Sequence, residues 1–313
     1  MRPDGSLLLL TTATGFGYGL LAWLGFDTAV GLLPARAATL IVAGVTISLI
    51  LVSIGLAASA FHLGRKARAW RAFSQWRSSW LSREAVASVL TYPVIIAFGL
   101  VVWREGEVLW ARVLGVATLA ASLGTVYCTA MIYASLKPIR QWHNAHTAPD
   151  YLLYAIFSGA LLFAVLRTIV LGGPGLAAST AAATTTAVAL IAKRAYWRHI
   201  DSQAPLATLS SAIGLPKGVA AKSLDAPHFT ENFILREMAF AIARRHAARL
   251  RGLVLVIGFV LPLLLSGLAS FALAPAATTT LALLCAALGL LLERWLFFAE
   301  ATHVSALYYG RAI

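Results

Sequence analysis

Long apolar runs separated by polar connections make up most of this chain. Most of the runs are near the ~20 residues that a helix needs to cross the ~30 Å hydrocarbon core of a membrane. They cover residues 6–26, 37–61, 85–103, 112–135, 151–171, 176–192, 252–273 and 277–301. We therefore predict an all-α, polytopic membrane protein with eight transmembrane helices, arranged as two four-helix bundles in one domain over residues 1–313. The sixth run is the weakest, because it is short and rich in Ala and Thr.

The composition supports a membrane location. Of the 313 residues, 60% are hydrophobic and 12% are charged, and this charged fraction is roughly half that of a soluble domain. The net charge of +13 could suggest nucleic acid. However, the sequence carries no nucleic-acid-binding motif, and loop cations of membrane proteins serve topology and lipid head groups. Cys128 and Cys285 each lie inside an apolar run and cannot form a C-x-x-C motif, so no metal site is expected.

The cations sort to one side of the predicted membrane. With eight crossings, both termini and the even-numbered connections share a face, which carries twenty Lys and Arg residues against three on the other face. Removing the ten cations of the long connection, residues 193–251, leaves ten against three. Because cytoplasmic connections are rich in Lys and Arg, we predict a multi-pass protein of the bacterial inner membrane with both termini cytoplasmic.

The connection over residues 193–251 is predicted to form a long cytoplasmic loop. Residues 201–228 are rich in Pro, Gly and Ser and are expected to be irregular. Residues 229–246 carry an apolar stripe at helical spacing, interrupted once by Glu237, which predicts an amphipathic helix. This helix could lie in the layer of lipid head groups, or it could form a docking surface for a peripheral subunit, and the two interpretations are compatible.

A basic, Trp-rich connection between the second and third helices carries the best candidate chemistry. His62 stands at its entrance and Glu84 at its exit, so both are predicted at the cytoplasmic edge of the membrane. Gly64 is expected to end the second helix and Ser82 to cap the third. In these positions His62 and Glu84 could simply be favourable charges opposite the helix dipoles. The alternative is a quinone site, because quinone reduction requires a donor to the carbonyl oxygens and a titratable group that relays protons.

Further residues could line the same site or its mouth. Ionisable residues within a span are candidates for function, because they are costly in lipid and must face protein or water. In the eighth helix Glu293, Glu300 and His303 fall on one stripe, although helix packing alone could explain Glu293 and Arg294. The additional candidates for quinone binding are Gly64, Arg68, Trp70, Trp80, Glu293, Arg294, Glu300 and His303. Arg167 could reach the outer head groups and receives no role.

Haem is the main alternative cofactor. Ligation by two His residues needs imidazoles that face each other at one depth in the membrane. All seven His residues are predicted on the cytoplasmic side or in its connections, and none near the middle of the membrane. We therefore expect no haem, although a haem at the membrane edge, held by His62 and His303, stays open as an alternative.

Three runs of the sequence resemble the anchor subunits of the dimethyl sulfoxide reductase family. They cover residues 62–84, 131–142 and 293–301, and residues 232–251 fit as well, so the resemblance covers nearly the whole chain. One departure is Lys66, where many relatives have Pro after the His-Leu-Gly motif.

The resemblance implies a fold of eight helices without haem, and electron exchange with quinone (ubiquinone or menaquinone). The implied electron partner is a ferredoxin-like, four-cluster iron–sulfur subunit, with a molybdopterin catalytic subunit beyond it. The quinone-site residues of the family carry over onto His62, as the donor to a quinone carbonyl, and Glu84, as the proton relay.

Within that family, the predicted topology favours the complexes that oxidise sulfite. Anchors of the reductase type hold exported catalytic subunits on the outer face, whereas here the connection that carries His62 and Glu84 has the charge excess of the cytoplasmic face. We expect electrons to pass from cytoplasmic sulfite oxidation, catalysed by the partner subunits, to the membrane quinone pool. The alternatives are quinol oxidation that feeds a reductase of S-oxides, N-oxides or polysulfide, a transporter, and a purely structural anchor.

Overall fold

The computed structural model describes residues 3–31, 37–62, 66–105, 109–216, 218–219, 221 and 246–309. Over these ranges the chain forms helices and no strand, and eight helical segments are long and apolar enough to cross a membrane. The predicted all-α, polytopic membrane fold is therefore confirmed. The predicted amphipathic helix over residues 229–246 lies almost wholly outside the described residues.

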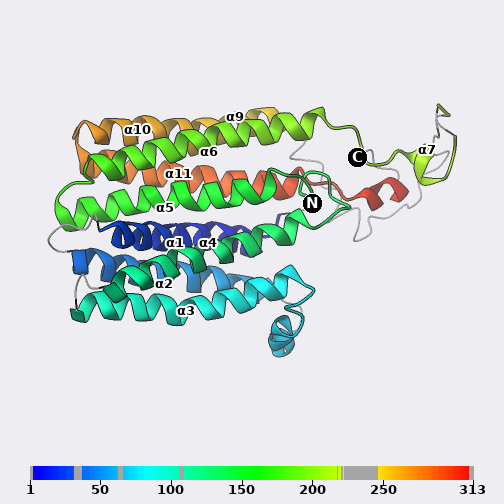
Figure 1. Cartoon of the computed structure of the whole chain (residues 1–313). Helices are drawn as coiled ribbons and strands as arrows, with labels where there is room; N and C mark the ends of the chain where they lie inside the picture. Colours follow the sequence, from blue (N-terminus) through cyan, green and yellow to red (C-terminus); the bar gives the residue numbers. More distant parts are fainter. Residues whose placement is uncertain are drawn as a thin grey trace.

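Two four-helix bundles lie side by side (Figure 1). The first bundle contains α1 (Gly5–Val30), α2 (Ala37–His62), α3 (Trp80–Glu105) and α4 (Leu109–Ala134). The second contains α5 (Thr147–Leu171), α6 (Leu176–Ser202), α11 (Pro275–Ala299) and a seventh segment made of α9 (Ala247–Leu255), the π-helical turn η3 (Val256–Val260) and α10 (Leu261–Ser270). Three short elements, η1 (Lys66–Phe73), α7 (Leu209–Ala212) and η4 (Val304–Tyr309), lie outside the bundles. The contacts between elements close a ring of four helices in each bundle, as predicted.

Helices α1 and α5 join the two bundles through a contact between glycines. A methyl group on Gly19 would lie 1.9 Å from the backbone oxygen of Ala155, and one on Gly159 would lie 2.1 Å from the backbone carbon of Gly19. Small residues let membrane helices approach until their backbones touch, which gains van der Waals contact where lipid offers no hydrophobic driving force. The contact fixes how the bundles sit against each other, and the residues described below lie near their junction.

Three predicted boundaries are wrong in ways that matter for the site. Helix α6 continues from residue 192 to Ser202, because Lys193, Tyr196, Trp197 and Ile200 pack into the second bundle. The long connection is shortened accordingly, and Lys193 is a buried residue instead of a loop cation. Helix α9 begins at Ala247, so the loop also ends before residue 251.

The third correction concerns the start of α3. This helix begins at Trp80, and the backbone oxygen of Ser79 accepts the hydrogen bond from the Arg83 amide at 3.0 Å. Ser82 is therefore buried inside the first turns of α3 and does not cap the helix. As a result, Glu84 lies more than a full turn inside α3, deeper than predicted.

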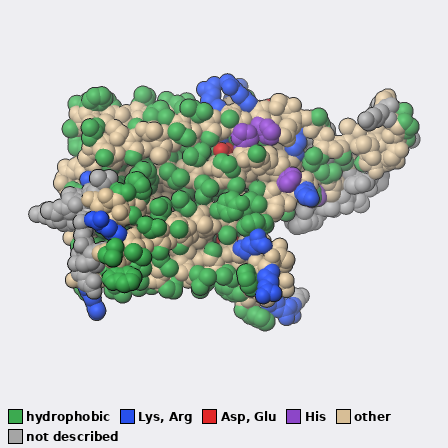
Figure 2. Space-filling model, viewed as in Figure 1, with side chains coloured by type: hydrophobic (Ala, Val, Ile, Leu, Met, Phe, Trp, Pro, Cys, Tyr) green, Lys and Arg blue, Asp and Glu red, His purple; other side chains and the backbone are tan. Residues whose placement is uncertain are grey.

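Many of the polar side chains lie at one end of the two bundles. In Figure 2 the His side chains and many Lys and Arg side chains lie toward this end, which in Figure 1 is also where η1 projects from the first bundle and where α7 lies. The starts of α1, α3 and α5 and the ends of α2, α4 and α6 share this end, as the order of crossings requires. We call it the polar end.

Candidate functional site

Glu84 is a buried carboxylate near the polar end of the first bundle. The residue is 7% exposed, and its Oε1 accepts a hydrogen bond of 2.6 Å from Thr129 Oγ1 of α4. Thr129 Oγ1 also lies 3.2 Å from the backbone oxygen of Thr125, one turn earlier in the same helix. Among the described residues the Thr129 hydroxyl is the donor to this carboxylate, so the carboxylate is poorly solvated.

Thr129 also lines a small cavity at the junction of the two bundles. The cavity has a volume of about 30 Å³ and lies among α1, α4, α5 and α11. Its wall includes the polar side chains of Thr12, Thr129, Tyr151, Tyr154 and Arg294. This volume holds about two water molecules and is too small for a quinone ring. Thr129 therefore links Glu84 to a cavity that has room for water and several polar side chains in its wall.

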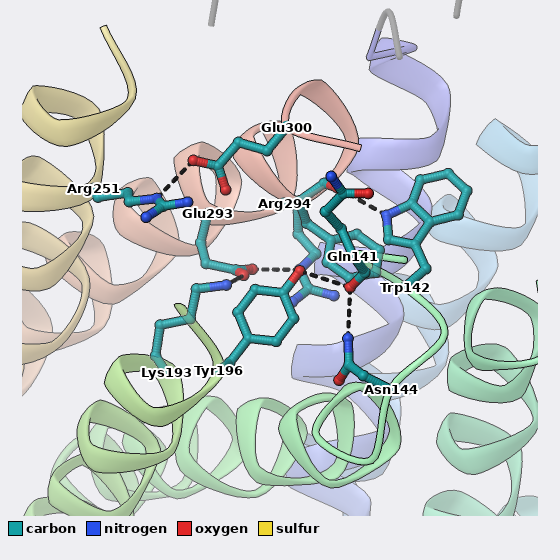
Figure 3. A network of polar contacts seen from close by, with 10 residues as sticks. Gln141, Trp142, Asn144, Lys193, Tyr196, Arg251, Glu293, Arg294 and Glu300 are labelled. Atoms are coloured by element: carbon teal, nitrogen blue, oxygen red, sulfur yellow. Dashed lines mark hydrogen bonds and ion pairs between the residues drawn. The ribbon is translucent and has the colours of Figure 1, made fainter. Parts of the chain in front are cut away.

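Beyond the cavity lies a cluster of buried charges in the second bundle (Figure 3). Glu293 is 0% exposed, its Oε2 accepts a bond of 2.5 Å from Arg294 Nε, and its Oε1 pairs with Lys193 Nζ. The Arg294 guanidinium lies 4.2 Å from the ring centre of Tyr151, and the Lys193 ammonium lies 4.2 Å from that of Tyr196. Paired charges and aromatic faces together replace the water that these groups lose.

A second ion-pair group lies farther toward the polar end. Arg251 of α9 donates from Nε to Glu300 Oε1 at 2.7 Å and from Nη1 to Asp201 Oδ2 at 2.7 Å. Glu300 follows directly after α11, and Asp201 lies in the last turn of α6. These contacts link the ends of three helices. We call this ion-pair group the clamp, and Glu300 is part of it, away from Glu84.

The connection between α4 and α5 is also fixed to the second bundle (Figure 3). Trp142 Nε1 donates to the backbone oxygen of Phe297 at 2.9 Å, and the Tyr196 hydroxyl donates to the backbone oxygen of Gln141 at 3.0 Å. Asn144 Nδ2 donates to the same Gln141 oxygen at 2.8 Å. These bonds fix the start of α5, which carries Tyr151 and Tyr154 to the cavity.

The chain matches one family model over almost its whole length. The model described as "DMSO reductase anchor subunit (DmsC)" covers residues 2–309. The chain belongs to this family. Its relatives include the C subunit of the sulfite dehydrogenase of Allochromatium vinosum, which is 36% identical over 327 residues, or 99% of each chain. The protein is therefore a multi-pass membrane anchor subunit of a DMSO-reductase-type oxidoreductase.

In this anchor subunit the basic connection after α2 forms an exposed surface. Arg68 is exposed, and the exposed fractions of Trp70 and Trp76 are 65% and 52%. Trp80 is only partly exposed and packs between the Arg83 guanidinium, 4.2 Å from its ring centre, and the Tyr127 ring. The predicted site residue Gly64 and the His62 side chain lie outside the described residues.

The predicted site residues of the anchor subunit thus lie in several separate places. Glu84 and Arg294 approach the same cavity, one through Thr129 and the other directly. Glu293 lies behind Arg294, whereas Glu300 belongs to the clamp. His303 is partly exposed beyond α11, where its Nδ1 bonds the Ser305 hydroxyl at 2.7 Å.

Sequence reasoning missed two features of the anchor subunit. The first is Lys193, which would have stood out if the helical spacing of Ala189, Lys193, Tyr196 and Ile200 had been followed past residue 192. The second is Arg167, whose Nη1 lies 3.5 Å from Asp27 Oδ2 and whose Nε donates to the Pro174 backbone oxygen at 3.0 Å. Arg167 therefore faces protein partners, and no local signal in the sequence joins it to Asp27.

Proposed function

We propose that this anchor subunit binds quinone at the polar end of its first bundle and passes electrons from sulfite oxidation to it. The observation that carries the proposal is the buried Glu84 carboxylate, which lies near the membrane edge and next to a water-sized polar cavity. Reduction of a quinone to a quinol consumes two electrons and two protons. Electrons would arrive from an iron–sulfur centre of a partner, so the anchor must supply the protons and hold the ring.

The quinone ring would lie at the mouth formed by the end of α2, the connection with η1 and the start of α3. The cavity beside Thr129 is too small for the ring, so the ring would lie outside it, on the other side of Glu84. In this arrangement Glu84 donates a proton to one carbonyl oxygen, and His62 donates a hydrogen bond to the other. The exposed Trp70 and Trp76 suit the membrane interface, where the lipid tail of a quinone enters.

The charge distribution supports cytoplasmic partners. Among the described residues, most Lys and Arg lie toward the polar end, and cations of this kind mark the cytoplasmic face of the inner membrane. Both termini would be cytoplasmic, and a ferredoxin-like iron–sulfur subunit with a molybdopterin subunit would dock on this face. The relative named as part of a sulfite dehydrogenase supports sulfite as the electron source.

The test replaces Glu84 with Gln in the complete complex. We expect sulfite-dependent reduction of a short-chain quinone to fall by about 100-fold or more, the usual size of a lost proton-transfer group. Sulfite-dependent reduction of a water-soluble, one-electron dye should not change, because the dye takes electrons from the partner subunits before they reach the anchor. Asp27→Asn, which changes another buried acid, serves as the control. Wild-type quinone turnover in the Glu84→Gln complex would refute the proposal.

Quinol oxidation in the opposite direction is the second candidate, because the description of the family model names a DMSO reductase. The same site would then take protons from the quinol instead of supplying them. An anaerobic assay that offers a quinol analogue with an S-oxide, an N-oxide or polysulfide separates the two directions. Sulfite-dependent quinone reduction without any of these reductase activities would exclude the second candidate.

A further inference from the structure

One face of α5 carries proton-exchanging side chains from the polar end to the cavity. His146 precedes the helix, Asp150 lies in its first turn and Tyr154 follows one turn later. Their spacing of four residues places neighbours next to each other on the same face of a helix, about 6 Å apart along its axis. The three side chains therefore form a row that begins at the surface and ends at the cavity wall, where Tyr154 lies.

The outer end of the row is a pair of imidazoles. The ring centres of His146 and His199 of α6 lie 4.9 Å apart, and both residues are partly exposed. Burial and the nearby His199 lower the pKa of His146, so its ring is mainly neutral at pH 7 and free to accept a proton from water.

The middle of the row is Asp150, which is 4% exposed. The charged groups that face it from other helices are Lys193 of α6 and Glu293 and Arg294 of α11. These three groups carry a formal excess of one positive charge, which an ionised Asp150 cancels. The cluster thus places a titratable carboxyl group beside a net positive charge in a dry interior, where an ionisable group is a candidate for function.

The inner end of the row opens into the cavity. Tyr154 and Thr12 both line it, and neither hydroxyl has a hydrogen-bond partner among the described residues. Buried hydroxyls without partners are rare, and a cavity of this size with several polar side chains in its wall can hold ordered water. Thr129 also lines the cavity and donates to Glu84, so its hydroxyl oxygen can accept a bond from water in the cavity.

We propose that protons reach Glu84 through the second bundle, from His146 and His199 by way of Asp150, Tyr154 and water in the cavity. The inference rests on the proposed function, because it supplies the protons that quinone reduction consumes. Water would have to bridge the oxygen and nitrogen atoms between which each proton moves, because Tyr154 OH has no hydrogen-bond partner among the described residues. No transfer changes an oxidation state. Asp150 and Tyr154 act through Glu84 and do not touch the quinone.

The test compares Asp150→Asn with Asp27→Asn in the complete, purified complex. The two acids are similarly buried, at 4% and 7% exposure. Asp27 lies near the end of α1, away from the polar end, whereas Asp150 lies in the first turn of α5. We expect Asp150→Asn to lower sulfite-dependent quinone reduction roughly tenfold, most strongly at alkaline pH where protons are scarce. The solvent isotope effect should rise, and Asp150→Glu or added formic acid, a small proton carrier, should restore turnover.

Tyr154→Phe gives a second measurement, since it removes only the hydroxyl and leaves the charged cluster intact. It should shift the pH profile in the same direction as Asp150→Asn. Loss of turnover in Asp150→Asn without a larger isotope effect and without rescue would show a structural role and overturn the proposal. Wild-type turnover of both variants at every pH, with Glu84→Gln still inactive, would overturn this path alone and leave the proposed function standing.

Discussion

The buried charge cluster of the second bundle allows a quantitative test through Glu293→Gln. Glu293 is the anion between two cations, and all three side chains are at most 5% exposed. The substitution keeps the shape of the side chain but removes the charge that Lys193 and Arg294 share. Removing one partner of a buried ion pair costs about 3–5 kcal/mol, because an uncompensated charge stays in the interior.

Glu300→Gln is the matched comparison, because Glu300 lies about two helical turns after Glu293 in the chain. Its partner Arg251 is 20% exposed and also holds Asp201, which is 58% exposed. After the substitution Arg251 keeps one carboxylate and some contact with water. The expected loss is about 1 kcal/mol, in the range of exposed ion pairs.

The assay is thermal unfolding of the chain in detergent, followed by the helical circular dichroism signal. For a chain of this length, about 3–5 kcal/mol corresponds to a midpoint lowered by roughly 6 °C, against roughly 2 °C for Glu300→Gln. Adding Lys193→Met to Glu293→Gln removes one of the two cations that have lost Glu293 and should recover part of the loss. Equal, small shifts for the two single variants would refute the reasoning, because they would mean that the cluster is solvated.

Two further predictions concern helix packing. Gly19→Ala should cost about 3 kcal/mol by forcing α1 away from Ala155, whereas Gly124→Ala, with open space around it, should be neutral or slightly stabilising in the same unfolding assay. Trp142→Phe should cost about 1–2 kcal/mol, because it leaves the Phe297 oxygen without its 2.9 Å donor. An unchanged unfolding midpoint in Gly19→Ala or Trp142→Phe would contradict the respective contact.

Much of the fold could be predicted because membrane insertion depends on local properties. A run of apolar residues crosses the membrane wherever the rest of the chain lies, so hydropathy alone located all eight spans. The errors fall at helix ends, where polar residues are compatible with either a loop or a buried surface. Lys193 looked like a loop cation until its partner Glu293 was known.

Only part of the candidate site could be predicted from the sequence. The position of Glu84 near the polar end followed from the order of the helices, but its hydroxyl partner Thr129 did not. The sequence analysis did not single out Asp150 and Tyr154, although their spacing of four residues places them on one face of α5. The meaning of this face depends on the cavity wall, to which four different helices contribute.

The sequence by itself determined the class of protein, the number of spans, the clustering of charge toward one end and the family. These follow from free energies of transfer and from motifs, which are properties of short segments. Only the tertiary structure decided which charges meet: Lys193 and Glu293 are 100 residues apart in the chain, and Arg167 and Asp27 are 140 apart. Such pairs form because packing brings distant helices together and excludes water, and no short segment carries that information.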